Sequence, residues 1–171
     1  MIDIFSRKVF VVIGFAIMAM SATAQDVSVP NGPVILTISG AVNAANVDGV
    51  LQLDYESLSA FDATMIETST IWTEGTHVFE GVSLHTLAEY LSVTDGMILA
   101  TAINDYMVEI PVSDAVEGGP IVAYLMDGEK MSVREKGPLW VIYPYDSNSD
   151  YRSEVTYTRS IWQLDRLEIE Q

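Results

Sequence analysis

The stretch TSTIWTEGTHVFEGVSLHTLAEYL, from Thr68 to Leu91, contains two strand patterns, a polar turn and an amphipathic helix. Side chains over 65–72 alternate between two faces, which predicts a strand. Residues 76–82 predict a second strand, paired with the first across the Thr-Glu-Gly turn. Trp72 comes where the core-like pattern stops and the turn begins, so we expect it at the rim of a pocket.

The rest of the chain continues this mixture of strands and short helices. Ser83 is a suitable N-cap for a helix over 84–91, whose apolar residues fall on one stripe. Asp54 can cap another short helix that ends at Phe61, and Asp127-Gly128 predicts a tight turn. A long polar loop is expected over 146–153, and further strands over 34–42, 97–102, 106–110, 121–126, 139–143 and 161–169. Many strands with a few short helices predict one α+β domain with mixed β-sheets.

The N-terminus has the pattern of a secretory signal peptide. Two basic residues precede an apolar run over 9–20, and the small-residue motif Ala22-Thr23-Ala24 follows it. The run is shorter than the roughly 20 apolar residues that span a bilayer. We therefore expect cleavage of residues 1–24, a periplasmic location without membrane insertion, and a single mature domain over 25–171.

Charge and cysteine content limit the functions that the chain can have. The sequence has 8 basic and 24 acidic residues, a net charge of −16, and no cysteine. Such a chain repels nucleic acid and anionic lipid, because contacts with phosphate need clustered Lys and Arg. No thiolate is available for catalysis or metal binding. After residue 24 every cation lies in the last quarter of the chain: Lys130, Arg134, Lys136, Arg152, Arg159 and Arg166.

Sequence motifs of metal sites, hydrolases and phosphate loops are missing. His77 and His85 lack the spacing and partners of a zinc motif, and the chain has no G-x-S-x-G or P-loop. What remains is an aromatic and polar set that suits a planar heterocycle, because rings stack on its faces while amides and carboxylates bond its edge. Alternatively, Trp140, Tyr143 and Trp162 are ordinary core and strand aromatics. The set is Trp72, Asn104, Asp105, Tyr106, Trp140, Tyr143, Tyr145, Tyr157 and Trp162.

Four segments, taken in order, resemble the molybdopterin-binding domain of the sulfite-oxidase family. They are IWTEGTHVFEGVSLHTLAEYL (71–91), TAINDYMVEIPVSD (101–114), VAYLMDGEKMSVREKGPLWVIYPYD (122–146) and YTRSIWQLDRLEI (157–169). The resemblance covers nearly all of the mature chain. It implies the α+β sulfite-oxidase fold, with a pterin cofactor between the loops that follow the strands.

The chain departs from this family at the metal ligand. In catalytic members a cysteine near the end of the strand that here reads IETSTIW binds molybdenum, whereas this chain has Ser69 or Thr70 there. A hydroxyl replaces a soft thiolate poorly, so we expect a bound pterin without molybdenum. In this respect the chain is similar to exported pterin-binding proteins that serve membrane-bound cyclic-di-GMP enzymes.

That similarity implies a non-catalytic sensory or regulatory protein, whose partner is the periplasmic domain of an inner-membrane signalling protein. Two alternatives stay open. One is a molybdopterin-dependent oxidoreductase component without the usual cysteine ligand, and the other is an interaction module with a vestigial pocket.

The resemblance also implies roles for individual residues. Trp72 would stack on the pterin ring, so its removal should weaken binding with little effect on the melting temperature, while Glu74 or Asp105 would accept hydrogen bonds from the ring edge. Glu74 is equally suited to a turn. The other expected contacts to the ring are Asn104, Tyr106 and Trp162. A phosphorylated side chain of the ligand would use cations, unless these lie on a solvated face: Lys130, Arg134, Lys136 and Arg159.

Overall fold

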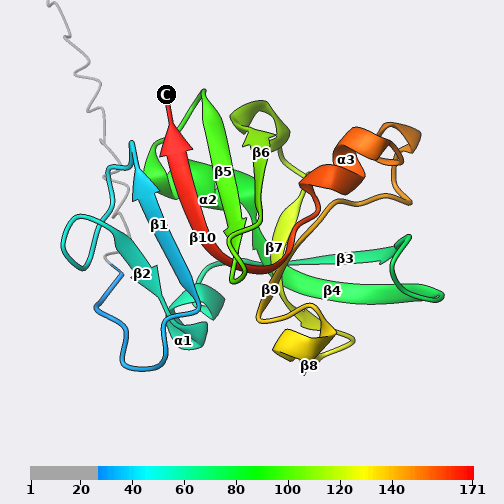
Figure 1. Cartoon of the computed structure of the whole chain (residues 1–171), viewed down its shortest axis with the longest axis horizontal. Helices are drawn as coiled ribbons and strands as arrows, with labels where there is room; N and C mark the ends of the chain where they lie inside the picture. The colour runs from blue at the N-terminus through cyan, green and yellow to red at the C-terminus, as the bar shows by residue number, and fades with distance from the viewer. Residues whose placement is uncertain (1–26) are drawn as a thin grey trace, which may run out of the picture.

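The computed structural model describes residues 27–171 (Figure 1), and the predicted signal peptide over 1–24 lies outside the described residues. The strands are β1 Leu36–Gly40, β2 Leu51–Leu53, β3 Ala63–Ser69, β4 Thr76–Ser83, β5 Met97–Ala102, β6 Met107–Pro111, β7 Ile121–Met126, β8 Glu129–Lys130, β9 Leu139–Ile142 and β10 Trp162–Glu170. The α-helices are α1 Tyr55–Ser59, α2 Leu84–Leu91 and α3 Glu154–Arg159. The 3₁₀ turns are η1 Val112–Asp114, η2 Val133–Glu135 and η3 Ser149–Tyr151.

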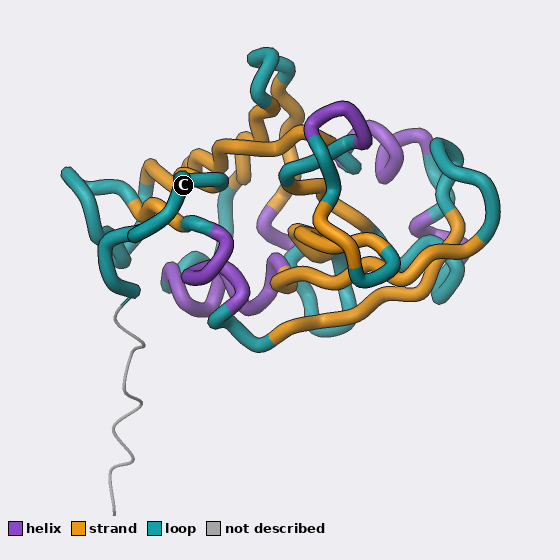
Figure 2. Tube along the Cα trace, turned by 90° about the horizontal axis from the view of Figure 1, so that it is seen from below, coloured by secondary structure: helices purple, strands orange, loops and turns teal. Residues whose placement is uncertain are grey.

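The ten strands form one mixed sheet, which confirms the predicted α+β class. Its main order is β2-β1-β10-β9-β7-β4-β3, with β5 also paired to β10, β6 to β5 and β8 to β7. Only the β1–β10 pair is parallel among the described strands. Figure 2 shows that the sheet is curled rather than flat.

Strand β10 joins the two parts of this sheet. Trp162 pairs with Trp140 of β9, whereas the strand beyond Leu164 pairs with β5 and β1. Between them Gln163 has a positive φ of 53°, a conformation that is uncommon for a residue with a side chain. This irregularity lets one strand leave β9 and continue between β1 and β5.

The local signals for the first hairpin and helix are confirmed. Ser83 caps α2 by accepting a hydrogen bond from the Thr86 N–H at 2.9 Å, and the predicted apolar stripe of α2 is buried. Gly81, in the motif FEGVSL, lies where β4 meets β7 at a bulge. A Cβ atom there would be 2.1 Å from the carbonyl oxygen of Val122, so this close approach of two strands requires glycine.

An aromatic cluster fills the centre of the core. Trp140, Tyr143 and Tyr145 are fully buried. The alternative that Trp140 and Tyr143 are ordinary core residues is therefore confirmed. Trp140 Nε1 donates to the carbonyl oxygen of Ser160 at 3.1 Å, and the Tyr145 hydroxyl donates to Ser160 Oγ at 2.5 Å. Trp162, the first residue of β10, is 38% exposed, so it is a strand aromatic but not a residue of the buried core.

Several predicted boundaries are also corrected. β3 ends at Ser69, not at residue 72, because the chain leaves the sheet to form the loop that carries Trp72. The predicted loop over 146–153 contains η3, and it leads into α3, which the sequence reading did not anticipate. The Asp127-Gly128 turn is confirmed, with positive φ at both residues and pairing of β7 with β8 around it.

Candidate functional site

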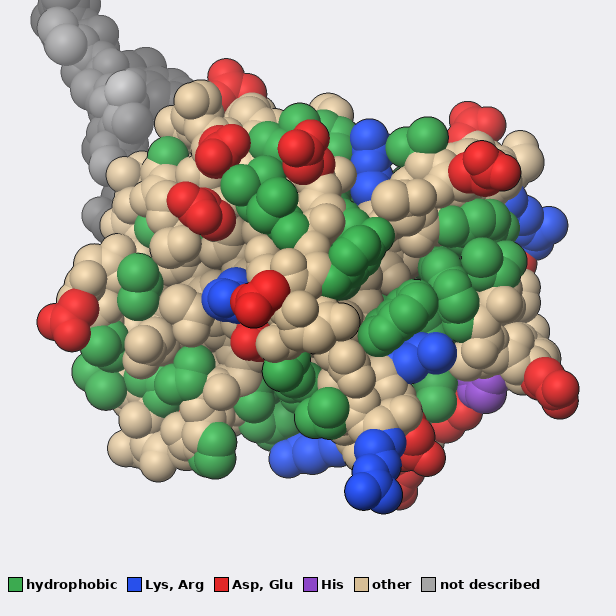
Figure 3. Space-filling model, in the orientation of Figure 1, with side chains coloured by type: hydrophobic (Ala, Val, Ile, Leu, Met, Phe, Trp, Pro, Cys, Tyr) green, Lys and Arg blue, Asp and Glu red, His purple; other side chains and the backbone are tan. Residues whose placement is uncertain are grey.

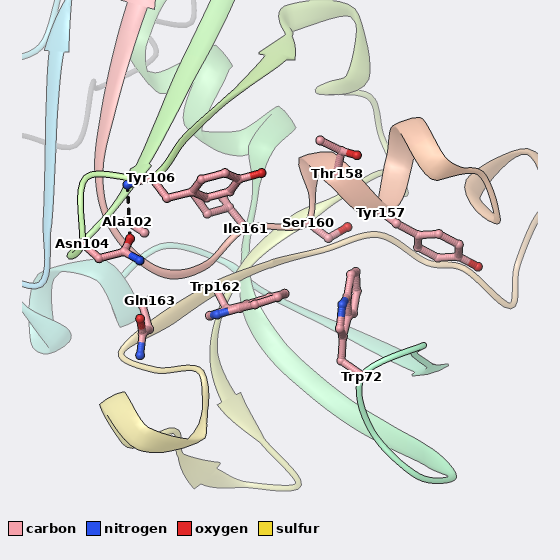
Figure 4. Close-up of a pocket in the computed structure, with 10 residues that line it drawn as sticks. All are labelled: Trp72, Ala102, Asn104, Tyr106, Tyr157, Thr158, Ser160, Ile161, Trp162 and Gln163. Carbon is pink, nitrogen blue, oxygen red and sulfur yellow. Dashed lines mark hydrogen bonds between the residues drawn. The ribbon is translucent and has the colours of Figure 1, made fainter.

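A cavity of about 450 Å³ lies where the β3–β4 loop, the β5–β6 turn, α3 and the start of β10 meet (Figure 4). This volume is within the usual range for small-molecule sites. Its lining is mainly aromatic and amide, and contains no charged side chain. The lining residues are Trp72, Ala102, Asn104, Tyr106, Tyr157, Thr158, Ser160, Ile161, Trp162 and Gln163.

Trp72 is the central aromatic residue of this pocket. Its ring centre lies 5.6 Å from that of Trp162 and 5.8 Å from those of Tyr157 and Trp140, each in an edge-to-face arrangement. Figure 4 shows Trp72 and Tyr157 at one end of the hollow and Tyr106 and Trp162 on either side of it. On the molecular surface, hydrophobic side chains gather around a hollow over the start of β10 and α3 (Figure 3). The aromatic groups therefore offer ring faces to a flat ligand.

The loop that carries Trp72 is anchored through Asp146. The carboxylate of Asp146 accepts hydrogen bonds from Ser69 N at 2.6 Å and from Ser69 Oγ at 2.9 Å, and Asp146 N donates to Thr68 Oγ1 at 3.1 Å. The bonds from Ser69 and the bond from Arg152 hold the pKa of Asp146 below its usual value. This clamp fixes the end of β3, three residues before Trp72.

A second anchor lies on the other side of the loop. His77 Nδ1 is 2.7 Å from Asp127 Oδ2, and His77 Nε2 is 3.0 Å from the carbonyl oxygen of Glu74. Both partners can only accept, so the two bonds together require the protonated imidazole. The bond to Asp127 raises the pKa of His77, although burial opposes this shift.

The His77 anchor gives a prediction about pH. Because the folded pKa is raised above the ordinary 6.5, the stabilisation is fully present below about pH 6.5 and is lost as the pH rises through the folded pKa. We expect the melting temperature of the native protein to fall as the pH rises from about 6.5 through the folded pKa of His77. In His77→Gln the melting temperature should depend less on pH over the same interval. His85→Gln is the control, since it leaves the anchor intact. Equal pH profiles for native protein and His77→Gln would contradict the anchor.

Several polar groups face the pocket without a hydrogen-bond partner among residues 27–171. Asn104 accepts from Tyr106 N at 3.2 Å through Oδ1, which leaves its amide N–H groups free, and Gln163 donates to the Val133 carbonyl at 2.6 Å through Nε2, which leaves its Oε1 free. The indole N–H groups of Trp72 and Trp162 are also unpaired within this part of the chain. One acceptor and several donors thus lie among the lining residues, as the polar edge of a heterocycle requires.

Four of the nine residues predicted for the site line this pocket, and a fifth lies against one of its aromatic walls. Trp72, Asn104, Tyr106 and Trp162 line it. Lys136 lies beside it, with Nζ 4.8 Å from the ring centre of Trp162 and 5.4 Å from that of Trp140. Lys136 therefore places a positive charge over Trp162, one of the lining aromatics.

The other four predicted residues are not among the lining residues. Glu74 is exposed in the β3–β4 turn, and Arg134 is exposed in η2. Asp105 has a positive φ and pairs with Arg166 at 2.7 Å. Arg159 pairs with Asp114 at 2.9 Å. The position of Glu74 is therefore explained by the turn, and the positions of Asp105 and Arg159 are explained by ion pairs within the chain.

Sequence reasoning missed most of the wall that follows Ser153, apart from Trp162. Ser153 accepts from Thr156 N and so caps α3, and Ser-x-x-Thr before an apolar residue could have indicated this short helix. Gln163 had no usable signal, because its place depends on the irregularity in β10. Tyr157, although noted among the aromatics, was not assigned to the site.

The position of the molybdenum-binding cysteine in the resembled family does not fit a metal here. Ser69 Oγ donates to Asp146, and Thr70 Oγ1 is 2.7 Å from Thr73 Oγ1 and accepts from Trp72 N at 3.1 Å. Both hydroxyls therefore shape the loop. Residues 27–171 also contain no group of three or more His, Cys, Asp or Glu placed to hold a metal ion.

Comparison with known proteins gives no family assignment. No protein-family model matches the chain, and no curated protein matches it. Among residues 27–171 no helix has the length and apolar character needed to cross a membrane.

Proposed function

We propose that the aromatic pocket binds a planar pterin and that the protein is a non-catalytic sensory or regulatory protein. The observation that carries the proposal is the cavity of about 450 Å³ between Trp72, Tyr106, Tyr157 and Trp162, with free amide and indole groups at its edge. A pterin has two flat faces for these rings and a polar edge for these groups. The resemblance to the sulfite-oxidase family supports a pterin over other heterocycles, and on the same resemblance we propose that the α+β domain has the sulfite-oxidase fold.

The proposal that the protein has no metal chemistry is supported by the residues at the end of β3, Ser69 and Thr70. A thiolate would have to replace a hydroxyl that now bonds Asp146 or Thr73, and the sequence has no cysteine. The chain would then bind the ligand and pass its occupancy to another protein. On the same resemblance, that protein is the periplasmic domain of an inner-membrane cyclic-di-GMP enzyme.

Lys136 gives a prediction about the side chain of the pterin. A bare pterin has no phosphate, whereas a phosphorylated one can form a charge-assisted bond with the ammonium group beside Trp162, worth about 1.5 to 3 kcal/mol. We expect the phosphorylated ligand to bind roughly ten- to a hundredfold more tightly and Lys136→Gln to remove this preference. Arg134→Gln, which removes a cation from the exposed η2 turn, should keep it. A preference that survives Lys136→Gln would place the phosphate elsewhere.

The proposal is tested by titrating the purified protein with a fully oxidised pterin and with a 7,8-dihydropterin under anaerobic conditions, following tryptophan fluorescence and heat. Binding of one pterin per chain, with a clear preference over adenine and guanine nucleosides, is the expected result. Similar weak binding of all these compounds would contradict a pterin site.

A further inference from the structure

The β3–β4 hairpin extends away from the rest of the sheet and leaves β3 as an edge strand (Figure 1). Within residues 27–171, β3 pairs with β4 alone. The orientation of its free backbone groups follows from Val78 in β4. Val78 N donates to Asp127 Oδ1 at 2.9 Å, and the Val78 carbonyl accepts from Asp127 N at 2.7 Å, so both groups of Val78 point away from β3.

Val78 stands opposite Glu67 in the antiparallel ladder. Glu67 is therefore in a pair without hydrogen bonds, and its own N–H and C=O point outward to the free edge. Because alternate residues of a strand point the same way, the N–H and C=O groups of Met65 and Ala63 also point to the free edge. Ser69 is next in this series, and its N–H does point outward, since it bonds Asp146. The edge thus presents three consecutive outward-facing backbone sites.

This edge lacks several of the usual protections against pairing. β3 contains no Pro, no Lys and no bulge against β4, which are common ways to block an edge strand. Met65 is 71% exposed on the outer face. An open, flat edge with an exposed apolar side chain is a template for an added strand.

The charge around the edge indicates what kind of strand fits. Met65 and Glu67 share the outer face of the hairpin with their partners Glu80 and Val78, so this face alternates apolar and acidic side chains. Asp62 precedes the strand, and at its other end Ser69 bonds Asp146, whose charge is paired with Arg152. A second copy of this chain would bring the same acids to the same edge.

We propose that the free edge of β3 binds an extended segment of a partner protein as an additional strand, and that the outward side chains of this segment are alternately apolar and basic. Its backbone would bond the outward groups of Ala63, Met65 and Glu67. Basic side chains opposite Glu67 and near Glu80 would fix its register. This inference does not depend on the identity of the pocket ligand.

The probe is a nine-residue peptide with valine and lysine alternating at its odd positions and threonine at every even position, so that one face of the strand alternates apolar and basic side chains. Two further peptides serve as comparisons: one of the same composition with the lysines grouped, and one of the same sequence with N-methyl groups on alternate amides. The alternating peptide should bind best and should slow hydrogen exchange of the Met65 and Glu67 amides, while those of Ile66 and Thr68 are already protected by β4. Equal binding of the N-methylated peptide, or protection located elsewhere, would overturn the proposal.

Two variants complete the test. Glu67→Lys should weaken binding of the alternating peptide about five- to tenfold, as expected when one exposed charge pair is reversed. Glu117→Lys, an equal charge change in the loop after β6, should leave this binding unchanged. Equal weakening by both would mean general electrostatic attraction and would overturn a site at β3. Met65→Pro removes an outward N–H and should abolish peptide binding with pterin affinity unchanged. Dimers of the native protein that Met65→Pro dissociates would instead identify a second copy as the occupant.

Discussion

Replacing Trp72 with alanine is expected to weaken pterin binding roughly five- to a hundredfold and to lower the melting temperature by several degrees. Stacking of a flat base on an aromatic ring contributes about 1 to 3 kcal/mol, which is roughly five- to a hundredfold in affinity. The lower melting temperature is expected because Trp72 contacts four other rings, those of Trp140, Tyr145, Tyr157 and Trp162. For a half-buried ring we expect a loss of about 2 kcal/mol, below the range for fully buried tryptophan.

This expectation corrects the prediction from sequence, which treated Trp72 as a rim residue whose removal leaves the melting temperature nearly unchanged. Tyr106→Ala separates the two effects. Tyr106 lines the same pocket but is 54% exposed and makes no ring contact within residues 27–171, so its removal should weaken binding and spare stability. Isothermal titration and thermal unfolding measure both quantities. Full pterin affinity in both variants would show that the ligand binds elsewhere.

Replacing Trp140 with alanine should have the largest effect on stability, a loss of about 3 to 5 kcal/mol in the free energy of unfolding. The indole is fully buried, and its N–H bonds the Ser160 carbonyl at 3.1 Å. Truncation leaves both a cavity and an unpaired buried carbonyl. Urea denaturation measures the loss.

Trp140→Phe keeps most of the ring volume and should be milder than Trp140→Ala. Because Ser160 also lines the pocket, we expect either change to weaken pterin binding indirectly. A loss below 1 kcal/mol in Trp140→Ala would contradict the central place of this residue in the core.

Local signals predicted much of the fold. The hairpin of β3 and β4 and the helix α2 follow from period-two alternation, the Ser83 cap and one apolar stripe, all of which act within a few residues. Strands β5, β6, β7 and β10 were also located within one or two residues of their bounds. Burial of Trp140 follows equally well from its place in an apolar strand.

The arrangement of the site depends on contacts that a local pattern does not contain. Ser69 meets Asp146 across 77 positions of sequence, and this clamp sets the loop that carries Trp72. The wall at Gln163 exists because β10 changes partners there. Arg159 was predicted as a ligand cation from its position near a motif, but Asp114, 45 residues away, pairs with it.

The most direct test of the central claim is the pterin and molybdenum content of the protein purified from its native compartment. Absorbance and fluorescence of the released ligand quantify the pterin, and mass spectrometry of the metal quantifies molybdenum in the same sample. We expect a pterin close to one per chain, molybdenum well below one per chain, and no turnover of sulfite or sulfoxide. One molybdenum per chain with measurable turnover would contradict the account and favour an oxidoreductase component that binds its metal without cysteine.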